Sequence, residues 1–169
     1  MNKGRLSVKE ITYLGASLAM IEVSKLALDF LPNVELVTLL FIVFTIFYGK
    51  KTILIALGFT FIECLLKGFN IWSIMYLYIW PLLIIIVCIA HKCKVDYLFY
   101  CILSAFFGLF FGMFCSIPYL FIGGFKMALT WWVAGIPYDI LHCVSNFIVC
   151  LILFNPLCRI MKKVMAGIL

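Results

Sequence analysis

Long apolar segments alternate with short polar turns along the whole chain of 169 residues. Most of these segments approach the roughly 20 apolar residues that a helix needs to cross a bilayer. We predict six membrane helices, which cover residues 8–31, 35–49, 52–67, 71–90, 96–121 and 131–158. No internal repeat and no Pro/Gly-rich linker divides them, so we expect residues 1–169 to form a single membrane domain.

The second and third segments are short, and only Gly49, Lys50 and Lys51 separate them. Two paired strands would leave backbone groups unsatisfied in lipid unless a barrel closed. The other apolar runs lack the alternation that is typical of barrel strands. The sequence therefore predicts a helical hairpin at this point and an all-α fold throughout.

Composition and charge add a location and an orientation. The chain is 67% hydrophobic and has a mean hydropathy of +1.24, which excludes an ordinary soluble domain and indicates a multi-pass plasma-membrane protein. Lys and Arg are retained on the cytoplasmic side. An N-in, C-in topology places ten of the 13 basic residues there, namely Lys3, Arg5, Lys9, Lys50, Lys51, Lys92, Lys94, Arg159, Lys162 and Lys163. The net charge of +6 is thus mainly a topology signal and requires no nucleic-acid partner.

Three polar residues share one face of the last apolar segment, because Asp139, His142 and Asn146 are spaced i, i+3 and i+7. Ionisable groups at membrane depth usually face the bundle interior or a water-filled cavity. We expect a ligand pocket here, and the alternative is a satisfied Asp–His pair beside an interfacial aromatic belt. The predicted substrate-binding residues are Asn33, Glu35, Asn70, Trp72, Tyr76, Trp80, Trp131, Trp132, Asp139, His142 and Asn146. This mixture of aromatic walls and a few polar groups suits a small heteroaromatic or amphipathic metabolite.

The first segment carries a similar stripe of Glu22, Lys25 and Asp29. Because the charges alternate at helical spacing, we expect these residues to neutralise one another in a structural role. Glu63 and Lys67 form a further i, i+4 pair, which we expect to shape the mouth of the pocket.

Small residues indicate close helix contacts, as they do in other membrane proteins. Gly108 and Gly112 form a GxxxG pair, which we expect to pack inside the bundle. Gly15 and Ala19 share one face of the first helix with Ala16 beside them. We expect this patch to receive the helix of a partner protein.

The sequence offers little evidence for catalysis. Eight cysteines form no CxxC pair, and the grouping of Cys88, His91 and Cys93 lacks the second ligand pair of a zinc site, so no metal or other cofactor is predicted. The chain also lacks a GxxxxGK[ST] phosphate loop, so any ATP-driven work would have to be done by partners.

Over essentially its whole length, the chain resembles the S components of energy-coupling factor (ECF) vitamin transporters. The stretches that carry the resemblance are LPNVELVTLL, WSIMYLYIWPLL, SIPYLFIGG and GIPYDILHCVSNFIVCLILFNPL. The resemblance implies a six-helix bundle that binds a vitamin-like molecule from outside and topples against a transmembrane T component powered by two cytoplasmic ATPases. It also implies that Gly15 and Ala19 take the positions of the Ala-xxx-Ala docking motif, with Gly in place of the first Ala.

Two other functions remain as alternatives. The polar stripes of the first and last helices suit a channel lining or a membrane scaffold that binds a protein. Asp139, His142 and Ser145 provide the residue types of an intramembrane enzyme. All three lie within two turns of one helix, however, whereas a nucleophile, base and orienting group normally converge from separate elements.

Overall fold

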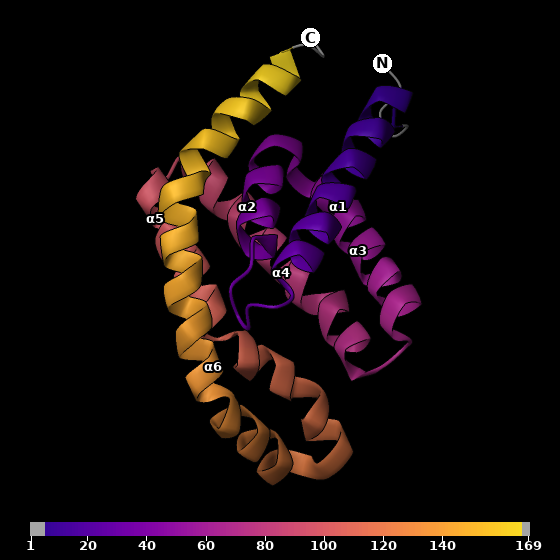
Figure 1. Ribbon diagram of the computed structural model, residues 1–169, viewed down its shortest axis with the longest axis vertical. Helices are drawn as coiled ribbons and strands as arrows, with labels where there is room; N and C mark the ends of the chain where they lie inside the picture. Colours follow the sequence, from indigo (N-terminus) through magenta and orange to yellow (C-terminus); the bar gives the residue numbers. More distant parts are fainter. Residues whose placement is uncertain (1–5, 167–169) are drawn as a thin grey trace.

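The computed structural model describes residues 6–166, which contain helices and no strand (Figure 1). The all-α prediction is therefore confirmed for this part of the chain. The elements are α1 (Val8–Leu28), α2 (Val37–Tyr48), the 3₁₀ turn η1 (Gly49–Lys51), α3 (Thr52–Lys67), α4 (Ile71–Lys92), α5 (Tyr97–Leu109) and α6 (Phe111–Ala166). Four stretches are long and apolar enough to cross a membrane, namely Val8–Leu28, Val37–Lys67, Ile71–Lys92 and Tyr97–Ala166.

Two glycines divide α6 into two arms. Gly123 and Gly124 leave the helical conformation, and the φ of +75° at Gly124 is one that glycine adopts without strain. The chain reverses direction there, so residues 111–122 and 125–166 form a helical hairpin (Figure 1). The predicted segment 96–121 corresponds to α5 and the first arm. The predicted segment 131–158 is too short, because the second arm is helical from just after Gly124 to Ala166.

The shortest α-helix lies at the centre of the bundle. Residues Val37–Thr45 of α2 are all buried, and α2 contacts α1, α3, α4, α5 and α6. A helix that is apolar on every side is stable only when it is enclosed in this way. Twelve residues at about 1.5 Å each span roughly 18 Å, which is less than the roughly 30 Å of a hydrocarbon core.

The predicted hairpin of the second and third segments is correct in its helices and its turn but not in its packing. The structure joins α2 to α3 through η1, as the short basic turn indicated. α3 nevertheless packs mainly on α4 and α1, and α2 packs mainly on α4 and α6. The apolar pattern of the sequence could not predict these neighbours, because α2 and α3 are both apolar over most of their surface.

An aromatic cluster forms the core between α2, α3 and α4. Trp80 stacks on Phe41 with ring centroids 4.8 Å apart and meets Phe59 edge-on at 5.8 Å. Tyr76 stacks on Phe59 at 5.5 Å. Rings in these geometries contribute about 0.5–1.5 kcal/mol per pair beyond the burial of their surface, so this cluster is a rigid part of the fold.

The second arm of α6 packs closely on α5 and on the first arm. The Gly112 N–H donates to Asp139 Oδ1 at 2.9 Å, and Asn146 Nδ2 donates to the Ser104 carbonyl at 3.3 Å. A Cβ placed on Gly108 would lie 2.9 Å from the backbone carbonyl of His142. The GxxxG pair therefore packs inside the bundle, as predicted, and it lets the polar stripe of α6 approach the opposing backbone.

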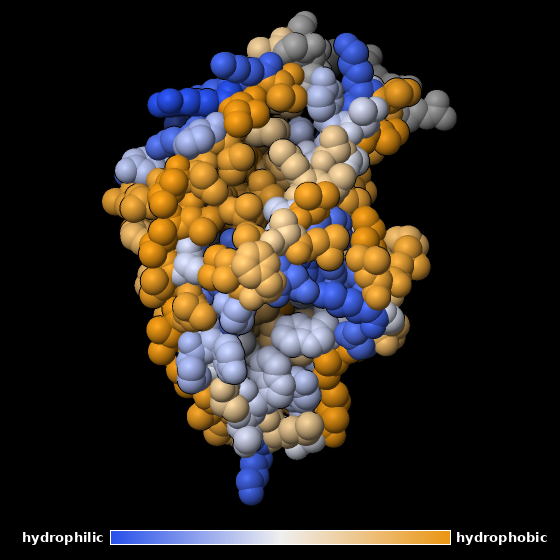
Figure 2. Space-filling view, viewed as in Figure 1, coloured by the Kyte–Doolittle hydropathy of each residue, from blue (hydrophilic) through white to orange (hydrophobic). Residues whose placement is uncertain are grey.

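The surface is compatible with a membrane protein. Phe61, Leu65 and Phe121 are each more than 60% exposed, and large apolar side chains are exposed on every helix except the central α2. Soluble monomers rarely expose so much contiguous apolar surface. Hydrophilic side chains gather at the end of the molecule that carries both termini (Figures 1 and 2). Lys3 and Arg5, which contribute to the predicted topology, lie outside the described residues.

We predict that Gly108→Ala lowers the free energy of unfolding by about 1–3 kcal/mol, because the new methyl group must push α5 away from the His142 backbone. Thermal unfolding of the protein in detergent measures the effect. Gly135→Ala is the matched control, since no heavy atom lies within 4 Å of its Cβ position. Equal stability of the two variants would show that the close contact is not important for folding.

Candidate functional site

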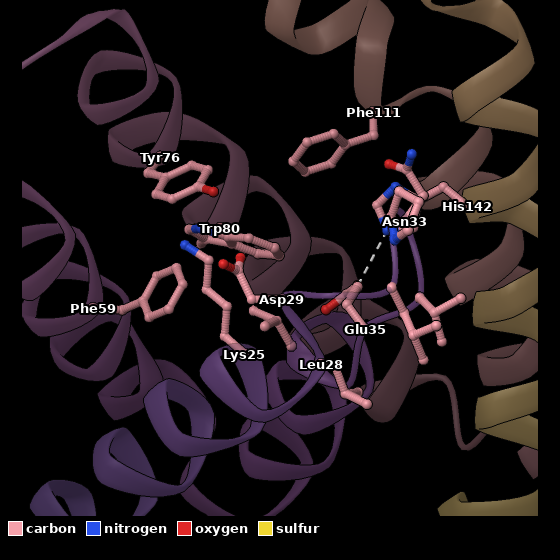
Figure 3. Close-up of a pocket in the computed structure, with 14 residues that line it drawn as sticks. Lys25, Leu28, Asp29, Asn33, Glu35, Phe59, Tyr76, Trp80, Phe111 and His142 are labelled. Atoms are coloured by element: carbon pink, nitrogen blue, oxygen red, sulfur yellow. Dashed lines mark hydrogen bonds and ion pairs between the residues drawn. The ribbon is translucent and has the colours of Figure 1, made fainter. Parts of the chain in front are cut away.

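A cavity of about 220 Å³ lies under the loop that joins α1 to α2, and we call it the loop cavity. The loop, residues 29–36, forms one side of it. The opposite wall consists of the aromatic rings of Phe59, Tyr76, Trp80 and Phe111 (Figure 3). The polar lining residues are Lys25, Asp29, Asn33, Glu35 and His142.

A second cavity of about 230 Å³ lies beside the first, between α3 and the start of α4, and we call it the α3–α4 cavity. Glu63, Lys67 and Asn70 supply polar groups, and Trp72 supplies an aromatic wall. Lys25 and Tyr76 line both cavities, so these two side chains separate them.

The loop is held in place by polar contacts with α6 and α2. Glu35 Oε1 lies 3.2 Å from His142 Nε2, the contact drawn as a dashed line in Figure 3. The Ser145 hydroxyl donates to the Asn33 carbonyl at 2.6 Å. The Thr38 N–H donates to Glu35 at 2.9 Å, which places a carboxylate at the positive N-terminal end of α2. These bonds satisfy polar groups that would otherwise be buried without partners.

Glu35 is a charged group in the loop. Burial raises its pKa, but the hydrogen bonds from His142 and Thr38 outweigh burial, so the pKa lies below the ordinary value of 4.5. The side chain is therefore a carboxylate at neutral pH. In that form it can pair with a protonated imidazole or accept a hydrogen bond from a neutral one.

Lys25 is a site residue that the sequence did not reveal as such. Its Nζ pairs with Glu63 and lies 5.2 Å from the ring centroid of Phe59 and 5.3 Å from that of Tyr76. The predicted self-neutralising stripe on α1 is therefore wrong in its partners, because α3 brings Glu63 to Lys25. Helical spacing shows which residues of one helix are neighbours but not what a second helix contributes. The predicted pair of Glu63 and Lys67 is present, with 3.4 Å between charged atoms.

Seven of the predicted substrate-binding residues line the two cavities. The loop cavity includes Asn33, Glu35, Tyr76, Trp80 and His142. The α3–α4 cavity includes Asn70, Trp72 and again Tyr76. Asn70 also accepts a hydrogen bond from the Trp72 N–H at 2.9 Å, which caps the first turn of α4.

The other four predicted residues lie outside both cavities. Trp131 packs against Trp72, with ring centroids 6.2 Å apart, so it lies beside the α3–α4 cavity. Trp132 lines a separate apolar groove between the arms of α6. Asp139 and Asn146 use their side chains to hold α6 against Gly112 and Ser104. Only His142 of the predicted stripe faces the loop cavity.

The structure also adds Phe59 and Phe111 to the cavity wall. The Phe111 ring meets the His142 imidazole edge-on, with centroids 5.1 Å apart. No sequence signal distinguishes these two residues among 17 phenylalanines. Their position depends entirely on how α3 and α6 pack.

The arrangement of Ser145 does not match a nucleophile with its base. The Ser145 hydroxyl donates to the carbonyls of Asn33 and His142, while the His142 ring pairs with Glu35. The two side chains thus bond to other groups and not to each other, whereas a histidine activates a nucleophile by a direct hydrogen bond. Within residues 6–166, no three His, Cys, Asp or Glu side chains are placed to hold a metal ion together.

Comparison with known proteins adds no identification, since no family model, curated protein or solved structure matches this chain. The fold and the site together define a helical protein with an apolar surface and a cavity that is aromatic on one side and polar on the other.

We predict that Glu35→Gln lowers the free energy of unfolding at neutral pH by about 1.5–3 kcal/mol, the contribution of a hydrogen bond to a charged group. A carboxyl whose pKa is lowered by folding stabilises the protein above the unfolded pKa, and this contribution is lost as the pH falls through the folded pKa. The melting temperatures of the wild type and Glu35→Gln should therefore converge below about pH 4.5. A constant difference between them down to pH 3 would contradict a charged Glu35.

Proposed function

We propose that this chain is the substrate-binding membrane subunit of an ECF-type importer for a vitamin or a related small micronutrient. The observation that carries the proposal is the loop cavity, an aromatic and polar space under a loop that is fixed by few contacts. A cavity with this lining suits the capture of one small molecule. The six membrane helices are then α1, α2, α3, α4, α5 with the first arm of α6, and the second arm of α6.

The lining supports a division of roles within the site. Tyr76, Trp80 and Phe111 provide flat apolar walls, and Asn33, Glu35 and His142 provide the polar groups that orient a ligand. A ligand enters when the loop moves away from α6. That movement breaks the contacts from Glu35 to His142 and from Asn33 to Ser145.

The partner-docking patch on α1 supports the same function. Gly15, Ala16 and Ala19 are all exposed, and no heavy atom lies within 4 Å of a Cβ placed on Gly15. The T component docks its helix on this patch, and the two cytoplasmic ATPases supply the energy for toppling. The protein lies in the plasma membrane with both ends in the cytoplasm. A channel would need a path through the bundle, whose centre is filled by α2.

We predict that the purified protein retains a small molecule, which mass spectrometry detects after denaturation. Trp80→Leu should lose this molecule, because it removes the central aromatic wall of the loop cavity. Trp132→Leu should keep it, because Trp132 lies in a different groove. Both variants must elute as monodisperse protein before the comparison is made. Retention of the same molecule by both variants would place the binding site elsewhere.

We predict that Gly15→Leu weakens association with a co-expressed T component by about tenfold or more, because the larger side chain keeps the two helices apart. The open space around Gly15 means that the variant should fold and retain its ligand. Gly135→Leu, at another open position, should associate normally. Affinity purification with tagged T component measures the association, and undiminished recovery of Gly15→Leu would rule out docking at this patch.

A further inference from the structure

Buried polar atoms without partners surround the boundary between the two cavities. Within residues 6–166, both carboxylate oxygens of Glu22, Glu63 Oε1 and Trp80 Nε1 are buried and form no hydrogen bond. Glu22 lines neither cavity, so the unpaired atoms of this set on lining residues are the acceptor Glu63 Oε1 and the donor Trp80 Nε1. Glu22, Glu63 and Trp80 are at most 6% exposed, and Glu63 and Trp80 line the cavities. A ligand that donates a hydrogen bond to Glu63 Oε1 would satisfy this buried carboxylate oxygen.

The charged residues around the cavities also indicate a ligand that donates hydrogen bonds to carboxylates. The lining contains the carboxylates of Asp29, Glu35 and Glu63 but only the two lysines Lys25 and Lys67. The lining therefore holds more carboxylates than ammonium groups. Buried carboxylates are costly unless a positive charge compensates them.

Lys25 already occupies a position suited to a cation. Its ammonium group lies near the rings of Phe59 and Tyr76 and pairs with Glu63. Aromatic faces carry negative partial charge and attract ammonium groups, especially where water is excluded. Figure 3 shows the Lys25 side chain reaching between these rings. The lysine is thus a tethered occupant of a cation site.

Lys25 also limits the size of the site. Each cavity alone is smaller than the roughly 300–1,000 Å³ of typical small-molecule pockets, whereas the two cavities joined fall within that range. Lys25 separates them with a long flexible side chain. Asp29 lies one turn further along α1, at the exposed rim of the loop cavity, and offers the displaced ammonium another carboxylate.

We propose that the site takes an organic cation, a planar ring compound that carries a protonated amine or a quaternary nitrogen. Its positive group takes the place of Lys25 Nζ against Phe59, Tyr76 and Glu63, while Lys25 turns toward Asp29. The return of Lys25 to Glu63 expels the ligand. This inference rests on the proposed function and specifies the ligand class for the same site.

The test uses three probes of equal ring size on the full chain in detergent, with affinity measured by titration calorimetry at neutral pH. Benzylamine is the cation, benzyl alcohol is the neutral analogue and benzoate is the anion. We expect the wild type to prefer benzylamine. Lys25→Met should bind benzylamine about tenfold more tightly, because the internal competitor is gone. Lys51→Met removes an exposed lysine that also pairs with a glutamate, Glu10, and should leave the affinity unchanged.

A second pair of variants keeps the test decisive if Lys25→Met does not fold. Glu63→Gln should weaken benzylamine about tenfold and leave benzyl alcohol unaffected. The double variant Lys25→Met with Glu63→Gln removes both charges and should bind benzyl alcohol about as well as benzylamine. A preference for benzylamine that survives in the double variant would overturn the role of Glu63 as the partner of the cation.

The opposite ligand class gives a distinct result. If benzoate binds the wild type best and loses affinity in Lys25→Met, Lys25 is an anion-binding residue and the cation proposal is overturned. The same result would leave the proposed function intact, because an aromatic ligand still binds. If none of the probes binds the wild type or Lys25→Met, the cation proposal is also overturned. The mass-spectrometric test of Trp80→Leu then decides the proposed function separately.

Discussion

The structure depends on the shortness of its central helix. α2 has 12 residues, is buried on all sides and covers only about 18 Å of depth. The non-helical loop 29–36 joins α1 to this short helix. Irregular backbone is tolerated at membrane depth only where protein buries it or where it lines a cavity. The loop lines the loop cavity, and Ser145 satisfies the Asn33 carbonyl while Glu35 satisfies the Thr38 N–H. The loop and the cavity thus follow from the same short helix.

The second arm of α6 provides the rigid support against which this loop is held. Asp139, before His142, bonds to Gly112, and Asn146, after it, bonds to Ser104. The small Gly108 lets the helices approach each other. The helix is therefore anchored before and after His142, and this side chain projects toward Glu35. Because only a few bonds join loop 29–36 to His142 and Ser145, the loop can open without disturbing the helix bundle.

The long apolar runs made the helical fold and most helix boundaries predictable. The start of the second arm of α6 was not predictable, because Lys126 and the tryptophans after it resemble an interfacial loop. In the structure this stretch is helical, and the Thr130 hydroxyl donates to the Lys126 carbonyl. His142 lines the loop cavity, but spacing could not show that Asp139, three residues away, faces the other arm. The pairing of Lys25 with Glu63 was beyond the sequence, because it requires knowing that α1 packs on α3.

Lys25 connects stability with function. A buried ion pair gains little stability, because desolvation of both charges offsets their attraction, and apolar side chains of similar size often replace such pairs without loss. The pair of Lys25 and Glu63 forms part of a cavity wall, where an apolar replacement would abolish the exchange of one cation for another. α1 contributes only Leu14, Ser17, Ile21 and Glu22 to the buried interior, so one narrow face holds it. Because Lys25 and the exposed Gly15 and Ala19 share this helix, the proposed ligand and the proposed partner act on the same element.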